Sequence, residues 1–228
     1  MKHSGKAQQA AMRMIWITLL VLLAVLLAAL IATVLGQIVL AVSTALIFVW
    51  ALFVLFTLYF FRDPEARVPT GKGLVVSPGH GKVDVVDTTT ETRFLGGECQ
   101  RISIFLSVFD VHVQNAPVNG RVVFLKHTPG RYLSALKSDC ALHNENVLLG
   151  IEAADPAGEK ISVRLVAGVL ARRIIPWVEA GEEIALGERI SLIQFGSRVE
   201  VYLPGRAKVR VKVGDRVVGG ESILAVFD

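Results

Sequence analysis

Two long apolar runs open the chain. No charged residue occurs from Met14 to Leu35, and after Gly36-Gln37 a second uncharged run extends from Ile38 to Phe61. Each run is long enough to cross a hydrocarbon core of about 30 Å as a helix. A pair of helices buried in a soluble core would keep a polar face at helical spacing, and neither run has one. The pattern predicts a membrane-anchoring helical hairpin over residues 1–61, with its tip at the short polar break.

The flanks of this hairpin indicate its orientation. A secretory signal peptide has one shorter apolar region, so it does not account for a second run directly behind the first. Both ends of the hairpin carry basic residues: Lys2, Lys6 and Arg13 before it, and Arg62, Arg67 and Lys72 after it. Basic flanks stay on the cytoplasmic side of a membrane. We therefore expect a cell-membrane protein whose remaining residues lie on the cytoplasmic side.

Short β-branched runs fill residues 62–228. The composition changes abruptly at Arg62-Asp63-Pro64, and Gly, Pro and Asn then separate runs such as 101–106, 161–166 and 199–203. This alternation is typical of a mostly β domain, built as a β-sandwich or partial barrel. The segment has the size of one domain.

An internal repeat lies towards the C-terminus. Residues 178–190 match residues 211–223, glycine for glycine and branched apolar residue for branched apolar residue. The pattern is typical of the hammerhead-like hairpins of lipoyl and biotinyl domains, in which glycines permit tight turns between short strands. The exposed lysine tip that carries the cofactor in those domains is missing. We therefore interpret the repeat as structural, without a cofactor-carrying role.

Composition narrows the class of protein. The chain is 53% hydrophobic with a mean hydropathy of +0.55, and the apolar surplus is concentrated at its N-terminus. The net charge of +4 comes without Lys/Arg runs, which argues against nucleic acid and suits an anionic membrane surface better. Cys99 and Cys140 form no metal-binding spacing and no disulfide framework, which favours a reducing compartment.

Candidate chemistry centres on Gly196-Ser197, which lies between apolar residues. Glycine lets its peptide carbonyl be approached closely, and the serine Oγ can reach that carbonyl through a five-membered ring. The attack would replace the amide by an ester. Elimination and hydrolysis would then convert Ser197 into a pyruvoyl group at a new N-terminus. A Gly-Ser pair alone is more typical of an ordinary turn, so the rest of the chain decides.

Two histidines occur in settings suited to proton transfer. His112 follows Asp110 at the end of a predicted strand, where a neighbour could orient it as a general acid or base. His80 lies in a glycine turn where the backbone could approach a ligand. Either could also be an ordinary loop residue. His127 and His143 have no such setting and fit no metal site, so we interpret them as structural.

Six segments, in chain order, carry a resemblance to a known family. They are Phe60-Phe61-Arg62-Asp63-Pro64, Val76-Ser77-Pro78 with Gly81-Lys82-Val83, Ile102 to Val113, Asn144-Glu145-Asn146, Gly168 with Ala171-Arg172-Arg173-Ile174, and Phe195 to Pro204. Together they span nearly the whole chain and resemble the short, pyruvoyl-dependent phosphatidylserine decarboxylases.

The resemblance implies a proenzyme with a catalytic domain over residues 62–228. It would cut itself between Gly196 and Ser197 into a β chain and a short α chain, which stay together as a heterodimer. The covalent cofactor would be the pyruvoyl group derived from Ser197, and no metal is implied. The amine of phosphatidylserine would form a Schiff base with it, lose CO₂, and leave as phosphatidylethanolamine.

Roles for other residues follow from the same resemblance. His112 is our candidate for the acid that reprotonates the carbon. Arg172 and Arg173 are candidate contacts to the lipid phosphate or the anionic surface, and Phe105 is a further candidate for substrate binding.

One departure from the family concerns His80. The family has aspartate in this turn, where it orients the histidine that activates the serine. Three alternatives follow: His80 acts as base or as partner of His112, Asp110 substitutes for the aspartate, or self-cleavage is impaired.

Other functions remain open at this point. The chain could decarboxylate another serine lipid such as archaetidylserine. It could also be a non-catalytic, membrane-bound lipid-binding relative that does not mature, or a membrane-tethered adaptor. The intact Gly196-Ser197 pair favours the decarboxylase.

Overall fold

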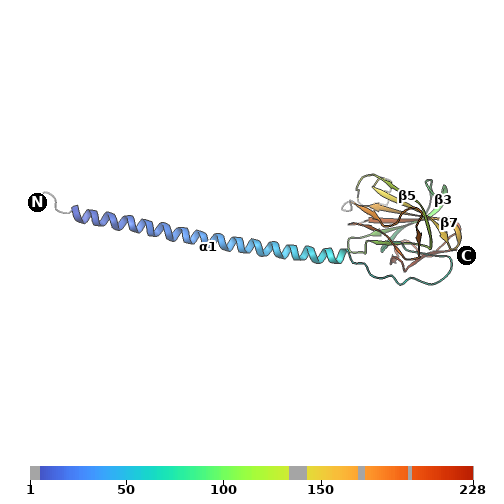
Figure 1. Cartoon of the computed structure of the whole chain (residues 1–228), viewed down its shortest axis with the longest axis horizontal. Helices are drawn as coiled ribbons and strands as arrows, with labels where there is room; N and C mark the ends of the chain where they lie inside the picture. Colours follow the sequence, from blue (N-terminus) through green and yellow to red (C-terminus); the bar gives the residue numbers. More distant parts are fainter. Residues whose placement is uncertain (1–5, 134–142, 169–172, 195–196, 228) are drawn as a thin grey trace. The chain divides into compact units, whose positions relative to one another are not determined.

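The structure, a computed structural model, describes residues 6–133, 143–168, 173–194 and 197–227 (Figure 1). It divides into two compact units, residues 1–57 and 58–228. Both the Phe195-Gly196 part of the predicted cleavage motif and Arg172 lie outside the described residues.

Within the described residues, one helix, α1 (Lys6–Phe60), contains both apolar runs. Its stretch Met12–Phe60 is long and apolar enough to span a membrane. The predicted hairpin is not confirmed, because α1 continues through Gly36-Gln37. A lone glycine costs a helix only about 1 kcal/mol relative to alanine, and no proline interrupts the run. Helical propensity alone therefore does not break the chain at this point.

The remaining residues form strands. Their bounds are β1 (Leu74–Val76), β2 (Gly81–Glu91), β3 (Gly97–Leu106), β4 (Val113–Asn115), β5 (Gly120–Thr128), β6 (Asn146–Ala154), β7 (Ala157–Ala167), β8 (Ile174–Pro176), β9 (Glu183–Ile184), β10 (Arg189–Ile193), β11 (Ser197–Leu203), β12 (Lys208–Val209), β13 (Arg216–Val217) and β14 (Ile223–Val226). The prediction of a mostly β domain is confirmed.

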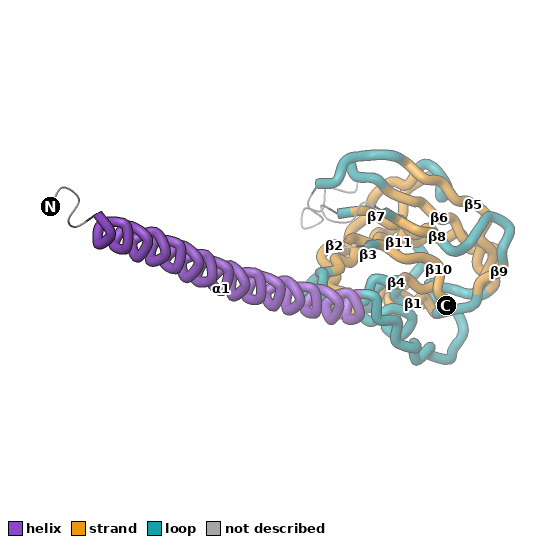
Figure 2. The backbone as a smooth tube through the Cα atoms, turned by 60° about the vertical axis from the view of Figure 1, so that its left-hand side comes forward, coloured by secondary structure: helices purple, strands orange, loops and turns teal. Residues whose placement is uncertain are grey.

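The described strands make three sheets. An eight-stranded sheet has the order β13-β2-β3-β11-β7-β6-β5-β9 and curls into a half-barrel (Figure 2). Two three-stranded sheets have the orders β1-β14-β12 and β4-β10-β8. One apolar core joins all three, with Ile104 and Val199 from the large sheet, Ile190 from β10 and Leu224 from β14.

The corresponding glycines of the repeated segments have matching backbone φ angles. Gly181 and Gly214 both have φ of +103°, and Gly187 and Gly220 have φ of +77° and +73°. These values lie in the left-handed region that favours glycine, which is why the repeat preserves these residues. The similarity to lipoyl-type hammerheads stays a prediction.

The equivalence of the two segments extends to the whole strand domain. Counted inward from the two outer strands of the large sheet, each strand of one half has a counterpart in the other half. The pairs of counterparts are β13 and β9, β2 and β5, β3 and β6, and β11 and β7. Both outer hairpins have a register shift at the equivalent place, after Val83 and after Val122. The strand domain therefore consists of two similar halves that meet where β11 pairs with β7.

One face of the large sheet is polar although it is buried. Arg198, Glu200 and Tyr202 of β11 point to this face, and we call it the polar face; the alternate residues of β11 enter the core. The Arg198 guanidinium is fully buried and donates to both oxygens of Asp84, at 2.7 and 2.6 Å. The Glu200 carboxylate accepts from Tyr202 and lies 3.6 Å from the guanidinium of Arg101.

The turn between β2 and β3 folds over the polar face. Phe94 in this turn stacks on Phe124 of β5 with ring centroids 5.9 Å apart. The space beneath the Phe94 ring is free because residue 150 is glycine, where a Cβ would lie 2.6 Å from the ring. Arg93 donates to Thr128 Oγ1 at 2.8 Å. These contacts hold β2 and β3 against β5 and β6, which lie beyond β11 and β7 in the sheet.

We predict that Arg198→Ala will lower the free energy of unfolding by about 3 kcal/mol, because it leaves the Asp84 carboxylate without its cationic partner. Urea unfolding of the detergent-solubilised chain, followed by Trp177 fluorescence after Trp16→Phe and Trp50→Phe, measures this. The matched control is Arg121→Ala, whose pair with Glu183 is exposed and should contribute less than about 1 kcal/mol. Equal losses in the two variants would contradict the prediction.

Candidate active site

Ser197 begins β11, at the point where β11 enters the large sheet. It lies opposite Leu106 of β3 on one side and Ala167 of β7 on the other. The residue is fully buried, and its Oγ has no hydrogen-bond partner among the described residues. Leaving a buried hydroxyl unsatisfied costs about 1–3 kcal/mol, so such groups are uncommon and often functional. The hydroxyl is thus not tied to a carbonyl of the described residues.

A short loop connects the surroundings of Ser197 to His112. The loop leaves β3 at Leu106, beside Ser197, and ends at His112. The His112 main-chain oxygen accepts from Ile193 N at 3.1 Å. Ile193 lies only four residues before Ser197. Both ends of the loop therefore contact strands that lead to Ser197, and we call the region formed by Leu106, His112, Ile193 and Ser197 the cleavage corner. His112 and Ser197 therefore belong to the same corner of the fold.

The surroundings of His112 determine its protonation. The side chain is fully buried, and the Phe60 ring lies with its centroid 4.2 Å from that of the imidazole. Burial lowers the pKa of His112 to about 4, so the imidazole is neutral at pH 7. Nδ1 lies 2.9 Å from the main-chain oxygen of Asp110, which only accepts. Nδ1 therefore carries the proton, and Nε2 is the basic nitrogen.

Asp110 shapes the loop through its carboxylate and orients His112 through its main chain. The Oδ2 atom accepts from Ser107 N and Ser107 Oγ, both at 2.8 Å. The Oδ1 atom lies 3.3 Å from the Arg216 guanidinium. The sequence suggested an Asp110–His112 pair, and the contact that orients the imidazole comes from the peptide carbonyl.

His80 lies in a turn packed beside the same corner. The adjacent Gly79 sits against Leu106 and Val199, each 3.5 Å from where a Cβ would be. The His80 ring covers Gly219, where a Cβ would come within 2.9 Å of Nε2. Burial lowers the pKa of His80, and the nearby charge of Asp110 opposes this in part. His80 is thus mainly neutral at pH 7.

The other predicted contacts have different positions. Phe105 of β3 is half-buried and pairs in register with Lys82 and Arg198. Arg173 is exposed, and its main-chain oxygen accepts from Gln194 N at 3.2 Å. Arg173 therefore lies next to the predicted cleavage corner.

The end of α1 lies at this corner. The Tyr59 hydroxyl and the Arg62 guanidinium both donate to the Phe109 main-chain oxygen, at 3.2 and 2.7 Å. The Phe109 side chain is 64% exposed, which is unusual for a large apolar group. Since Phe60, the last residue of α1, packs on His112, the apolar helix ends directly against the candidate catalytic histidine.

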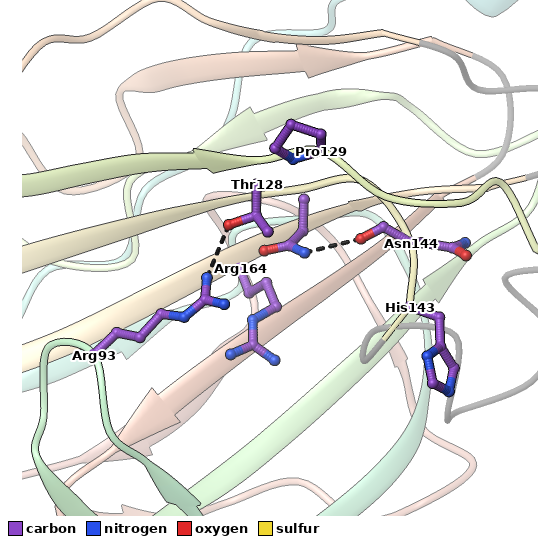
Figure 3. Close-up of a pocket in the computed structure, with 7 residues that line it drawn as sticks. Arg93, Thr128, Pro129, His143, Asn144 and Arg164 are labelled. Atoms are coloured by element: carbon purple, nitrogen blue, oxygen red, sulfur yellow. Dashed lines mark hydrogen bonds between the residues drawn. The ribbon is translucent and has the colours of Figure 1, made fainter.

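A polar pocket that the sequence did not reveal opens at the same end of the strands of the large sheet (Figure 3). Its volume is about 150 Å³. Its lining residues are Arg93, Thr128, Pro129, His143, Asn144, Asn146 and Arg164. They come from four separate parts of the chain, so no local pattern points to them; His143, which we interpreted as structural, is among them.

Comparison with known proteins follows this geometry. A family model described as phosphatidylserine decarboxylase matches residues 53–225. The chain is 46% identical over 179 residues to a phosphatidylserine decarboxylase proenzyme of Desulfotalea psychrophila, covering 78% of this chain and 83% of the relative. A proenzyme of the same name from Symbiobacterium thermophilum is 43% identical over 195 residues, covering 83% and 90%. One from Syntrophus aciditrophicus is 41% identical over 173 residues, covering 76% and 80%.

Proposed function

The chain belongs to the phosphatidylserine decarboxylase family, and we propose that it matures by cutting itself between Gly196 and Ser197. It is a carboxy-lyase that converts phosphatidylserine to phosphatidylethanolamine and CO₂. The observation that carries the proposed maturation is the buried Ser197 hydroxyl, which has no partner among the described residues and lies in the corner that holds His112. The relatives are named proenzymes, which agrees with a precursor that must be processed.

Self-cleavage begins with a transfer of the Gly196 acyl group from the nitrogen to the Oγ of Ser197, which leaves the two halves joined by an ester. The chain is cut when Ser197 then loses its Cα proton and its Cβ–Oγ bond breaks, which releases Gly196 as a carboxylate. Ser197 Oγ attacks the carbonyl carbon of Gly196, the C–O bond forms, and the C–N bond breaks. A base must take the hydroxyl proton and return it to the departing amine. The neutral His112 has this capacity at Nε2, because its Nδ1 proton is committed to the Asp110 carbonyl.

The residues around Ser197 fit a pyruvoyl group at this position. Once formed, that group supplies an electrophilic ketone that captures the substrate amine and accepts the electrons released with CO₂. The buried setting limits access of bulk water to the ketone, although forming the pyruvoyl group and releasing the product each require one water molecule. His112, after taking up a proton, is our candidate for the acid that protonates the substrate carbon.

The two chains made by cleavage would stay together. The α chain would begin with β11, which is paired along its length with β3 and β7. Its later strands β13 and β14 pair with β2 and β1. Breaking one peptide bond removes none of these hydrogen bonds, so we infer a β/α heterodimer.

We predict that the wild-type chain is cut although it has His80 where the family has aspartate. The imidazole of His112 is already oriented by a main-chain carbonyl, so cleavage does not need a carboxylate at position 80. Intact mass under denaturing conditions should show two chains divided at Gly196 for wild type and for His80→Ala. His80→Asp, which restores the family residue, is the comparison. A wild-type chain that remains whole while His80→Asp is cut would contradict this prediction.

We propose that the apolar segment anchors the enzyme to the cell membrane as two spans. At 1.5 Å per residue the 55 residues of α1 extend about 83 Å, whereas a hydrocarbon core is about 30 Å thick. Gln37 carries the only amide side chain between residues 14 and 61. A bend at Gly36-Gln37 would place this amide in the headgroup region, and both basic flanks would face the cytoplasm.

Labelling of single cysteines tests this topology. In a Cys99→Ser/Cys140→Ser background, Gln37→Cys should react with a membrane-impermeant maleimide in intact cells. Val68→Cys, which is exposed in the β domain, should react only after the membrane is permeabilised. Protection of position 37 in intact cells would contradict the two-span arrangement.

A further inference from the structure

The pocket in Figure 3 lies beside the cleavage corner without being part of it. Asn146 and Thr128 are opposite each other at one end of β6 and β5, and Asn146 is also opposite Val166 of β7. Ala167, the next residue, pairs with Ser197. The pocket and Ser197 therefore lie at the same end of the central strands, the pocket on the polar face with Arg164 opposite Glu200, and Ser197 on the core face.

Two guanidinium groups make the pocket electropositive. Arg93 is exposed, lines the pocket and donates from one nitrogen to Thr128 Oγ1 at 2.8 Å. Arg164 enters from β7, and its Nε is buried without a partner among the described residues. Glu200 lies 3.6 Å from both Arg164 and Arg101, so its charge is shared, and the Glu91 carboxylate accepts from the main-chain N–H groups of the turn that carries Arg93. Among its described lining residues the pocket thus has two guanidinium groups and no carboxylate.

Asn146 adds a buried acceptor to these donors. Its side chain is only 6% exposed. Its Nδ2 donates to the Asn144 main-chain oxygen at 2.9 Å, and this bond sets the orientation of the amide. Its Oδ1 is buried and has no hydrogen-bond partner among the described residues. A ligand that satisfies both sets of groups must carry an anion for the arginines and an N–H or O–H for Asn146.

We propose that this pocket binds a phosphate ester, with Arg93 and Arg164 on the phosphate and Asn146 Oδ1 accepting from an amino or hydroxyl group of the alcohol. Arginine is the residue best suited to phosphate, because its planar fork donates two hydrogen bonds at once. The volume of about 150 Å³ equals about five waters at about 30 Å³ each, enough for a phosphate and a few further atoms.

The position of the pocket favours a lipid headgroup over a soluble ester. The last residue of the apolar helix packs on the His112 end of the loop that starts at Leu106, and Leu106 lies at the same end of the strands as the pocket. Residues 58–60 belong to the same compact unit as the strands, so the point at which the apolar segment joins this unit lies at the end of the strands where the pocket opens. The site is separate from Ser197, so it would bind a headgroup whether or not that headgroup reacts.

Calorimetry on the full-length wild-type protein in detergent micelles tests the proposal. The probe is glycerophosphoglycerol, which has a phosphate and hydroxyl groups but no amine to react at Ser197. We expect one site per chain. Arg93→Gln should weaken binding by about tenfold or more, because it removes a charge-assisted contact. The matched control Arg121→Gln, an exposed arginine on the same strand domain, should leave binding unchanged.

Further arms identify the ligand and its source. Asn146→Leu should lower the affinity for glycerophosphoglycerol to the affinity that the same protein shows for inorganic phosphate. Micelles containing phosphatidylglycerol should compete with the soluble probe, whereas competition by inorganic phosphate alone would overturn the lipid assignment. Absence of any binding to a protein that still decarboxylates its substrate would overturn the pocket proposal and leave the proposed function intact.

Discussion

Replacing Ser197 with alanine will leave the protein as a single uncut chain without decarboxylase activity. The variant has no Oγ to attack the peptide and no atom from which the ketone could form. Intact mass should show one species near 24.7 kDa, and no CO₂ should be released from phosphatidylserine. The effect should be complete, because cleavage and cofactor both depend on the same hydroxyl.

Ser162→Ala is the matched control for this experiment. Ser162 is buried on the neighbouring strand β7, and its Oγ also has no partner among the described residues. If burial of a serine were the relevant property, the two variants would behave alike. We expect Ser162→Ala to be cut and active. A cut and active Ser197→Ala protein would refute the mechanism.

Replacing His112 with glutamine will reduce decarboxylation by about 10²–10⁴-fold, the usual contribution of a general acid or base. Glutamine fills similar space and can donate to the Asp110 carbonyl, but it has no titratable nitrogen. Initial rates with phosphatidylserine in mixed micelles measure the loss. Self-cleavage should also slow, because the same Nε2 is the base that we assign to that step.

The pH dependence of self-cleavage separates this catalytic role from a structural one. His112 acts as a base only while neutral, and burial lowers its pKa to about 4. The rate in wild type should therefore hold as the pH falls through 6.5 and decline only as it approaches about 4. The control His127→Gln changes an exposed histidine paired with Glu145 and should have no effect. An acid limb centred on 6.5, or full activity in His112→Gln, would contradict the assignment.

Much of the candidate site was predictable because it is encoded locally. Gly196-Ser197 combines the two residue types that an intramolecular attack needs, and the Asp110–His112 spacing predicts a proton-transfer group at a strand end; both roles stay predictions. The mode of contact was not predictable. Whether Asp110 meets the imidazole through its carboxylate or its peptide oxygen depends on the path of the loop, which Ser107 and Arg216 determine from elsewhere.

The fold shows a similar division. Residues 198–203 alternate as a strand should, and charged residues such as Arg198 and Glu200 are mostly exposed in proteins, whereas both are buried here. Their burial requires the curl of the sheet and the β2–β3 turn that packs on Gly150. The pocket depends on the same long-range packing, because it joins Arg93 to Arg164 across the sheet.

The sequence by itself determined that the chain has a long apolar segment, a mostly β domain, a Gly-Ser pair at which we predict cleavage, and a repeat of glycine positions. All of these rest on interactions between near neighbours or on composition, which are readable in one dimension. Only the tertiary structure decided that Phe60 packs on His112, that His112 stays neutral, and that two distant arginines share a pocket. Those properties arise from desolvation and contact between residues far apart in the chain, which no local pattern encodes.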